Sequence, residues 1–115
     1  EKQTKNLELK KEIHNILTLY NSKEFLKAKN KTKKLIEIYP KESNYYNLLG
    51  LILSQENKSE EAANVFKKAI KINPNFAVAY NNLGNIYKNR GNIKIAIWFD
   101  MVSLDVEKCI ENHFL

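Results

Sequence analysis

Residues 73–91 read NPNFAVAYNNLGNIYKNRG, and they contain the pattern Tyr-x-x-Leu-Gly-x-x-Tyr, which starts at Tyr80. The pattern also occurs earlier in the chain, where it starts at Tyr46 and has a leucine in its last position. Alanine, proline and aliphatic residues elsewhere recur with the same spacing: Ala28, Ala62 and Ala96; Pro40 and Pro74; Ile36, Ile70 and Leu104; Ile38, Ile72 and Val106. All these residues recur every 34 positions. A fixed period of this length indicates a chain made of stacked structural repeats.

These residues resemble the tetratricopeptide repeat, in which each unit is a pair of antiparallel helices. The unit that follows the family pattern most closely is 43–76, which carries Tyr46, Leu49, Gly50, Ala62, Phe66, Ala69 and Pro74. The resemblance implies an all-α fold, a right-handed superhelix of helix pairs called an α-solenoid. It covers nearly the whole chain and implies a single domain, 1–115, with about three repeats at roughly 9–42, 43–76 and 77–110.

The two ends of the chain depart from the pattern. The first repeat has Glu12, Asn15 and Ile16 where the later repeats have Tyr, Leu and Gly. In the third repeat Asp100 stands where the second has Phe66, and a lysine replaces the closing proline, so the last helix is expected to run on. Residues 111–115 then either open a fourth repeat of a longer array, with Phe114 in the tyrosine position, or end a capping helix. Helices are predicted over about 7–20, 23–39, 43–55, 59–72, 77–89 and from 92 onward.

Two glycines lie inside predicted helices, where glycine costs about 1 kcal/mol relative to alanine. A helix tolerates this cost where a second backbone must come close. We expect the close neighbour of Gly50 to be Ala62, and that of Gly84 to be Ala96. The leucines, phenylalanine and tyrosines of the pattern are expected to fill the core around these contacts.

The chain is basic, with a formal net charge of +6, but Arg90 is its single arginine. Proteins that read nucleic-acid sequence favour the planar guanidinium fork of arginine. The composition therefore argues against a nucleic-acid partner. A group of lysines around the second predicted helix favours a solvated convex face, with weak nucleic-acid binding as the alternative: Lys27, Lys29, Lys31, Lys33 and Lys34.

The sequence offers no chemistry of its own. Its one cysteine, Cys109, has no neighbouring motif of a nucleophile, and His14 and His113 lie far apart without ligand spacing around them. The three glycines belong to the repeats rather than to a phosphate-binding loop. No apolar run approaches the length of a membrane span. We expect no enzymatic activity, no cofactor, no metal, no membrane contact and a cytoplasmic location.

The first helices of successive units in a helix-pair solenoid line its concave face. In the tetratricopeptide-repeat family this groove binds an extended peptide or a helix of a partner protein. Asparagine amides both donate and accept hydrogen bonds and suit a peptide backbone, while leucines suit apolar side chains. A groove asparagine such as Asn82 is expected to have no part in holding the fold. The resemblance implies a protein partner and these groove residues: Ile13, Leu17, Asn47, Leu48, Leu51, Asn81, Asn82, Asn85, Lys88 and Asn89.

Our first hypothesis is therefore a non-catalytic module for protein–protein interaction. The second is the substrate-recruiting part of a larger glycosyl- or sulfo-transferase, because 79–85 is similar to repeats of O-linked N-acetylglucosamine transferases. The carboxylate clamp of chaperone-binding relatives is absent, since Ile13, Leu17 and Leu48 occupy its positions. Self-association through the C-terminal end is also expected, because a missing fourth repeat would leave apolar residues short of cover: Trp98, Met101, Val102 and Ile110.

Overall fold

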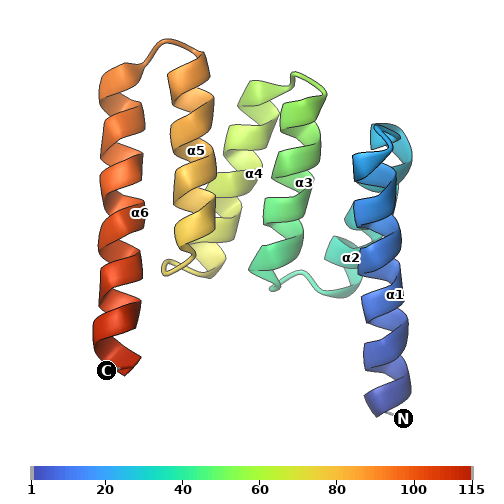
Figure 1. The fold of residues 1–115 in the computed structure, drawn as a ribbon. Helices are drawn as coiled ribbons and strands as arrows, with labels where there is room; N and C mark the ends of the chain where they lie inside the picture. Colours follow the sequence, from blue (N-terminus) through green and yellow to red (C-terminus); the bar gives the residue numbers. More distant parts are fainter. Residues whose placement is uncertain (1, 115) are drawn as a thin grey trace.

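The computed structural model describes the backbone of residues 2–114 and the side chains of residues 3–108, and it is helical except for short turns. Its six helices are α1 (Lys2–Asn21), α2 (Phe25–Ile38), α3 (Ser43–Gln55), α4 (Ser59–Ile72), α5 (Ala77–Asn89) and α6 (Ile93–Phe114). In Figure 1, α2 and α4 lie behind α1, α3 and α5, and α6 stands at one edge beside α5. The all-helical solenoid predicted from the repeat pattern is confirmed.

The limits of α3, α4 and α5 match the predicted ranges, and α2 begins at Phe25 rather than near residue 23. The first helix was placed too late, because α1 begins at Lys2 rather than near residue 7. The last helix runs through Lys108 without a break, as the loss of the closing proline predicts. Expectations about a fourth repeat and the C-terminal residues concern side chains outside the described part of the chain: Cys109, Ile110, His113 and Phe114.

The same left-handed turn joins the two helices of every repeat. Lys23, Asn57 and Gly91 have φ values of 63°, 63° and 84°, and they occupy the same position in the three repeats. The next residue donates its backbone N–H to a carbonyl five positions back, as in Glu24 to Leu19 at 2.9 Å. This is the Schellman motif, which satisfies carbonyls at the end of a helix. The sequence alone signalled it only at the glycine.

A second interaction that recurs at the repeat period explains why tyrosine and proline keep the same spacing in two repeats. The hydroxyl of Tyr46 donates to the carbonyl oxygen of Pro40 at 2.7 Å, and that of Tyr80 donates to Pro74 at 3.0 Å. The tyrosine ring fills space between helices while its hydroxyl satisfies a carbonyl of the preceding turn, where proline has ended the helix. The tyrosine thereby ties each repeat to the turn before it.

The expected close neighbour, Ala96, is found at Gly84, but at Gly50 the nearest residue is a different one. A Cβ atom added to Gly50 would lie 2.5 Å from the ring of Phe66, so the ring occupies the space a side chain would need. At Gly84 the added atom would lie 2.6 Å from Oδ1 of Asp100 and 3.3 Å from the backbone oxygen of Ala96. The prediction that Ala62 is the close neighbour of Gly50 was wrong, because the ring reaches further across the interface than a methyl group.

We predict that Gly50→Ala destabilises the fold by about 1–3 kcal/mol, the typical cost of overpacking a core. Phe66 is fully buried and cannot move away. Gly84→Ala is the matched control, because its nearest neighbour is the end of the exposed Asp100 side chain, which can rotate. The backbone oxygen of Ala96 at 3.3 Å must shift only slightly, and alanine favours the helix by about 1 kcal/mol. Urea unfolding of both variants measures the difference; equal midpoints would contradict the proposed role of Phe66.

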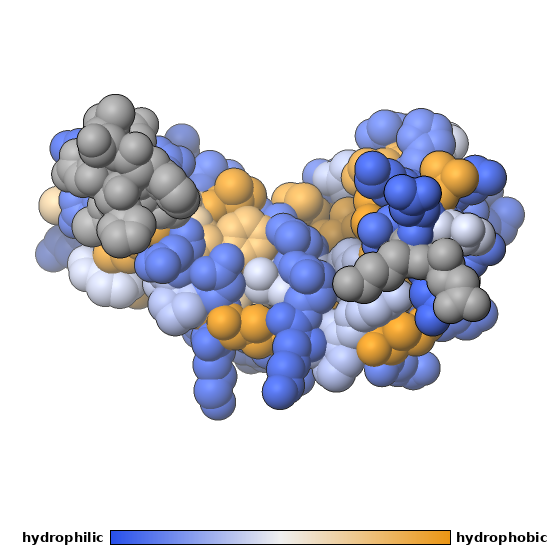
Figure 2. Space-filling model, turned by 90° about the horizontal axis from the view of Figure 1, so that it is seen from below, coloured by the Kyte–Doolittle hydropathy of each residue, from blue (hydrophilic) through white to orange (hydrophobic). Residues whose placement is uncertain are grey.

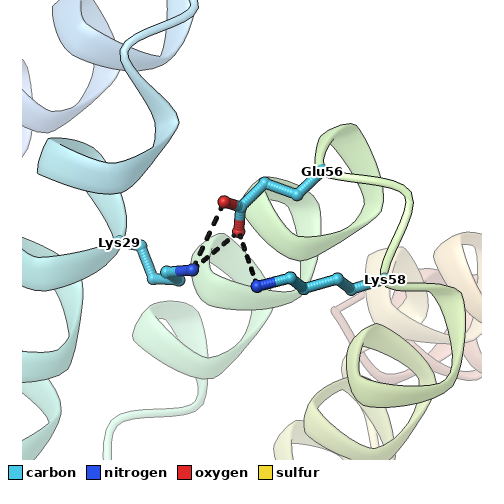
Figure 3. Close-up of polar contacts among 3 residues, drawn as sticks. All are labelled: Lys29, Glu56 and Lys58. Atoms are coloured by element: carbon cyan, nitrogen blue, oxygen red, sulfur yellow. Dashed lines mark hydrogen bonds and ion pairs between the residues drawn. The ribbon is translucent and has the colours of Figure 1, made fainter.

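One lysine of the basic group is buried rather than solvated. Lys29 is 9% exposed, and its Nζ lies 3.0 Å and 3.3 Å from the two carboxylate oxygens of Glu56 (Figure 3). The hydrogen bond with Glu56 raises the pKa of Lys29 above its ordinary value of 10.5. Lys58 approaches the same carboxylate at 4.0 Å. Lys29 comes from α2 and Glu56 follows α3, so this ion pair joins the first repeat to the second.

We predict that Glu56→Gln lowers the free energy of unfolding by about 1–3 kcal/mol, because it leaves a buried ammonium group without its charged partner. The folded chain holds the proton of Lys29 more tightly than the unfolded chain, so this contribution is complete below pH 10.5 and falls as the pH rises through the raised pKa. Glu24→Gln is the control, since its ion pair with Lys27 is solvent-exposed and exposed pairs contribute about 0–1 kcal/mol. Chemical denaturation at neutral pH that shows the same loss for both variants would contradict this account.

Candidate peptide-binding groove

The molecule is hollowed on one side between its two ends, and apolar side chains lie at the floor of the hollow (Figure 2). This is the side on which α1, α3 and α5 face the viewer in Figure 1. The first helices of the repeats therefore border the concave side of the array, which is where the groove was expected.

A depression of about 310 Å³, which we call the asparagine-lined depression, lies between α3, α5 and the start of α4. Its floor is apolar, because Phe66 and Ile86 belong to the buried core. Its walls carry amides and hydroxyls from the last turns of α3 and α5 and from the start of α4. The lining residues are Leu51, Ser54, Gln55, Asn57, Ser59, Phe66, Asn82, Asn85, Ile86 and Asn89.

Four of the predicted groove residues meet in this depression: Leu51, Asn82, Asn85 and Asn89. A fifth, Asn47, lies next to it, because its Oδ1 accepts a hydrogen bond of 2.8 Å from Nδ2 of Asn82. This bond joins α3 to α5 across two repeats. Asn82 was expected to have no part in the fold, and the structure corrects that expectation. Asn85 and Asn89 are exposed.

The other predicted residues lie elsewhere on the array. Ile13 and Leu48 are half-buried and pack against the core cluster between α1 and α3. Leu17 is exposed on α1, and Asn81 and Lys88 are exposed on α5 without lining the depression. The part of the expected groove near the first repeat is therefore more apolar than the part between α3 and α5, and side chains that pack on the core occupy it.

Sequence reasoning missed the last turn of α3 and the loop after it. Gln55 occupies the position in the second repeat that Asn89 occupies in the third, so extending the comparison of repeats to the end of the helix would have found it. Asn57 and Ser59 had no such signal, because they face the depression only through the left-handed turn at residue 57.

The chemistry of the depression is that of neutral hydrogen bonding. Among the described residues there is no cluster of three or more His, Cys, Asp and Glu side chains that could hold a metal ion. No described helix is long and apolar enough to cross a membrane. An apolar floor with amide walls suits a polypeptide, whose backbone needs donors and acceptors at regular intervals.

The sequence comparison with known families agrees with the repeat geometry. Residues 50–91 match the family model of the TPR repeat. This stretch is a tetratricopeptide repeat, and the six-helix solenoid has the architecture of such repeats. The same architecture occurs in the structure of the TPR2B-domain:pHsp70-complex of yeast Sti1, with a TM-score of 0.82, 16% identity and coverage of 90% of this chain and 82% of that one. The proposed similarity to O-linked N-acetylglucosamine transferases stays a prediction.

Three curated proteins share part of this tetratricopeptide-repeat sequence. The uncharacterized protein ycf37 of Pyropia yezoensis is 41% identical over 47% of this chain, which corresponds to 30% of its own length. The peroxisomal targeting signal receptor of Candida albicans is 37% identical over 56% of the chain and 11% of its own length. A chloroplastic tetratricopeptide repeat domain-containing protein of Arabidopsis thaliana is 33% identical over 45% of the chain and 17% of its own length. The matches thus span less than a third of each of these proteins.

Proposed function

We propose that the chain is a non-catalytic module for protein–protein interaction, and that it holds an extended peptide or a partner helix in the asparagine-lined depression. The observation that carries this proposal is the convergence of Asn82, Asn85 and Asn89 over the apolar floor. Two similar proteins support the general class, because the Sti1 domain is described in complex with pHsp70 and another relative is named as a targeting signal receptor.

The hydrogen bond between the two inner asparagines prepares the site for a peptide backbone. It uses one N–H of Asn82 and Oδ1 of Asn47. Oδ1 of Asn82 can then accept from a peptide N–H, and Nδ2 of Asn47 can donate to a peptide carbonyl. The bond also fixes both amides in orientation, so less side-chain freedom is lost on binding. An apolar side chain of the peptide would rest on Leu51, which lines the depression and is half-buried.

We predict that Asn85→Ala weakens a bound peptide by about 1–3 kcal/mol, because a peptide group would lose its partner after water is displaced. Asn85 is exposed, so the fold should be unaffected. Peptides that bind the chain would be selected from an array of extended sequences, and their affinity would be measured by titration calorimetry.

Two controls locate the site. Asn81→Ala removes the same amide from the same helix but outside the depression, and Lys68→Ala changes the convex side. Both should bind like the parent chain. Asn82→Ala should lose affinity and some stability together, because it also breaks the bond to Asn47. If Asn81→Ala or Lys68→Ala abolished binding while Asn85→Ala did not, the groove would lie elsewhere.

The second hypothesis, a substrate-recruiting part of a larger transferase, requires a catalytic domain in the parent protein and stays a prediction. Weak nucleic-acid binding loses support, since Lys27, Lys29 and Lys31 each contact a carboxylate. A cytoplasmic location also stays a prediction, and the chloroplastic relative makes a plastid the alternative compartment.

We also propose self-association through one face of α6, which we call the α6 stripe and which consists of Ile93, Ile97, Met101 and Leu104. All four side chains are exposed, and Ile97 is 53% exposed. Its counterpart in the preceding repeat, Ala63, is 3% exposed in the core cluster that includes Leu83 and Ile86 of α5. The stripe is thus the face that a first helix covers within the array. A second copy of the chain could cover the stripe with its own α1, which is the first helix of the first repeat. The exposed leucines of α1 would then contact the stripe.

Ile97→Glu should therefore reduce concentration-dependent association to a monomer, because it places a charge at the centre of the stripe. The control is Leu26→Glu, which places the same charge on an exposed leucine of α2. Sedimentation velocity over a range of protein concentrations measures both. A parent chain that stays monomeric at the highest concentration would contradict the proposal.

A further inference from the structure

A second pocket lies on the outer, convex side of the array, where α4 and α6 are exposed. We call it the convex aromatic pocket. It has a volume of about 390 Å³ and is lined by Lys67 of α4, Tyr87 of α5 and four residues of α6: Lys94, Ile95, Trp98 and Phe99. None of these residues belongs to the asparagine-lined depression or to the α6 stripe. The pocket is large enough for an apolar side chain and its neighbours.

The aromatic rings of the pocket form a connected layer. Phe99 stacks on Tyr87 with ring centroids 5.4 Å apart and planes 9° apart, and Trp98 meets Phe99 edge-on at 4.9 Å. Trp98 is 57% exposed and Ile95 is 43% exposed. A contiguous exposed apolar surface of this kind is unfavourable in water, and in soluble proteins it commonly marks an interaction site.

The preceding repeat shows that the fold does not require these residues. The six corresponding positions there hold Lys33, Leu53, Glu60, Glu61, Asn64 and Val65. Leu53 is buried and Val65 packs on the core, while Glu61 and Asn64 face solvent. Isoleucine and tryptophan have thus taken positions that polar residues fill in the same architecture. Packing of the solenoid does not account for Ile95 and Trp98.

The charges around the pocket select the kind of ligand. Two lysines line it, and no carboxylate does. Exposed aromatic faces also attract cations, but Nζ of Lys67 already lies 6.0 Å from the centroid of the Tyr87 ring. A cationic ligand would meet the repulsion of both ammonium groups, whereas an anionic ligand would be attracted by them.

We propose that the convex aromatic pocket binds an acidic peptide segment that places a large apolar side chain on Trp98 and Ile95 and carboxylates against Lys67 and Lys94. The pocket and the asparagine-lined depression have no lining residue in common, so the two sites can be occupied at the same time. The pocket thus adds a second partner site to the module, and it does not depend on the groove.

The test uses the intrinsic fluorescence of Trp98, which is the one tryptophan of the chain. The probe is a short capped peptide that alternates aspartate with leucine. Binding should shift the emission of Trp98 to shorter wavelength in a saturable way and weaken as salt is added. A peptide with lysine in place of aspartate, and a peptide with alanine in place of leucine, should each bind at least about tenfold more weakly.

Matched variants assign the effect to the pocket. The double variant Lys67→Glu, Lys94→Glu should lower affinity at least about tenfold, whereas Lys33→Glu, at the corresponding position of the preceding repeat, should not. Ile95→Glu should also abolish the shift. It should fold normally, because Glu61 occupies that position one repeat earlier. Asn85→Ala should leave the shift unchanged, and this separates the pocket from the groove.

Three results would overturn the proposal. Equal affinity for the aspartate and lysine peptides would show an apolar site without charge selection. An unchanged affinity in the Lys67→Glu, Lys94→Glu variant would place the peptide elsewhere. An emission shift that depends on protein concentration without peptide, and that persists in the Ile97→Glu variant, would show that a second copy of the chain covers the pocket.

Discussion

The contact between the ring of Phe66 and the backbone at Gly50 sets the geometry on which the centre of the array depends. The ring lies where a Cβ atom of residue 50 would be, and the side chain is 1% exposed. From α4 it packs against α3 and belongs to the cluster that also contains Leu83 and Ile86 of α5. This side chain therefore lies where α3, α4 and α5 meet, and it is also among the residues that line the asparagine-lined depression. The hydrogen bond between Asn47 and Asn82 forms because this packing brings α3 and α5 within reach of each other.

The sequence predicted the fold well because the signals of a repeat are local and occur more than once. Pro40 and Pro74 fix where helices stop, and the recurring tyrosine, leucine and glycine positions fix which face of each first helix is inside. The limits of α3, α4 and α5 followed directly. The first helix was harder, since the degenerate repeat lacks these markers and nothing in the residues before 7 signals a start.

The sequence could not predict the contacts that depend on how the helices and loops of different repeats are placed relative to each other. The pairing of Lys29 with Glu56 needs the angle between α2 and α3, and a lysine beside other lysines gives no local sign of burial. The left-handed turn at Lys23 is imposed by the hairpin geometry on a residue that does not favour it. For the groove, the sequence named four of the ten lining residues, because it followed the inner face of the helices but not the loops that close the depression.

The third repeat differs from the second in where its large side chains lie on the second helix, α6. Asp100 replaces the phenylalanine that fills the core of the second repeat, and its carboxylate oxygen lies near Gly84 instead of an aromatic ring. Two large apolar residues of α6 lie at the surface instead, Ile97 in the α6 stripe and Trp98 in the convex aromatic pocket. A helix that only closed a solenoid would need the opposite distribution, with a filled inner face and a polar outer face. Packing among the described helices therefore does not account for these exposed residues of α6, and this is why we propose that they contact other polypeptides.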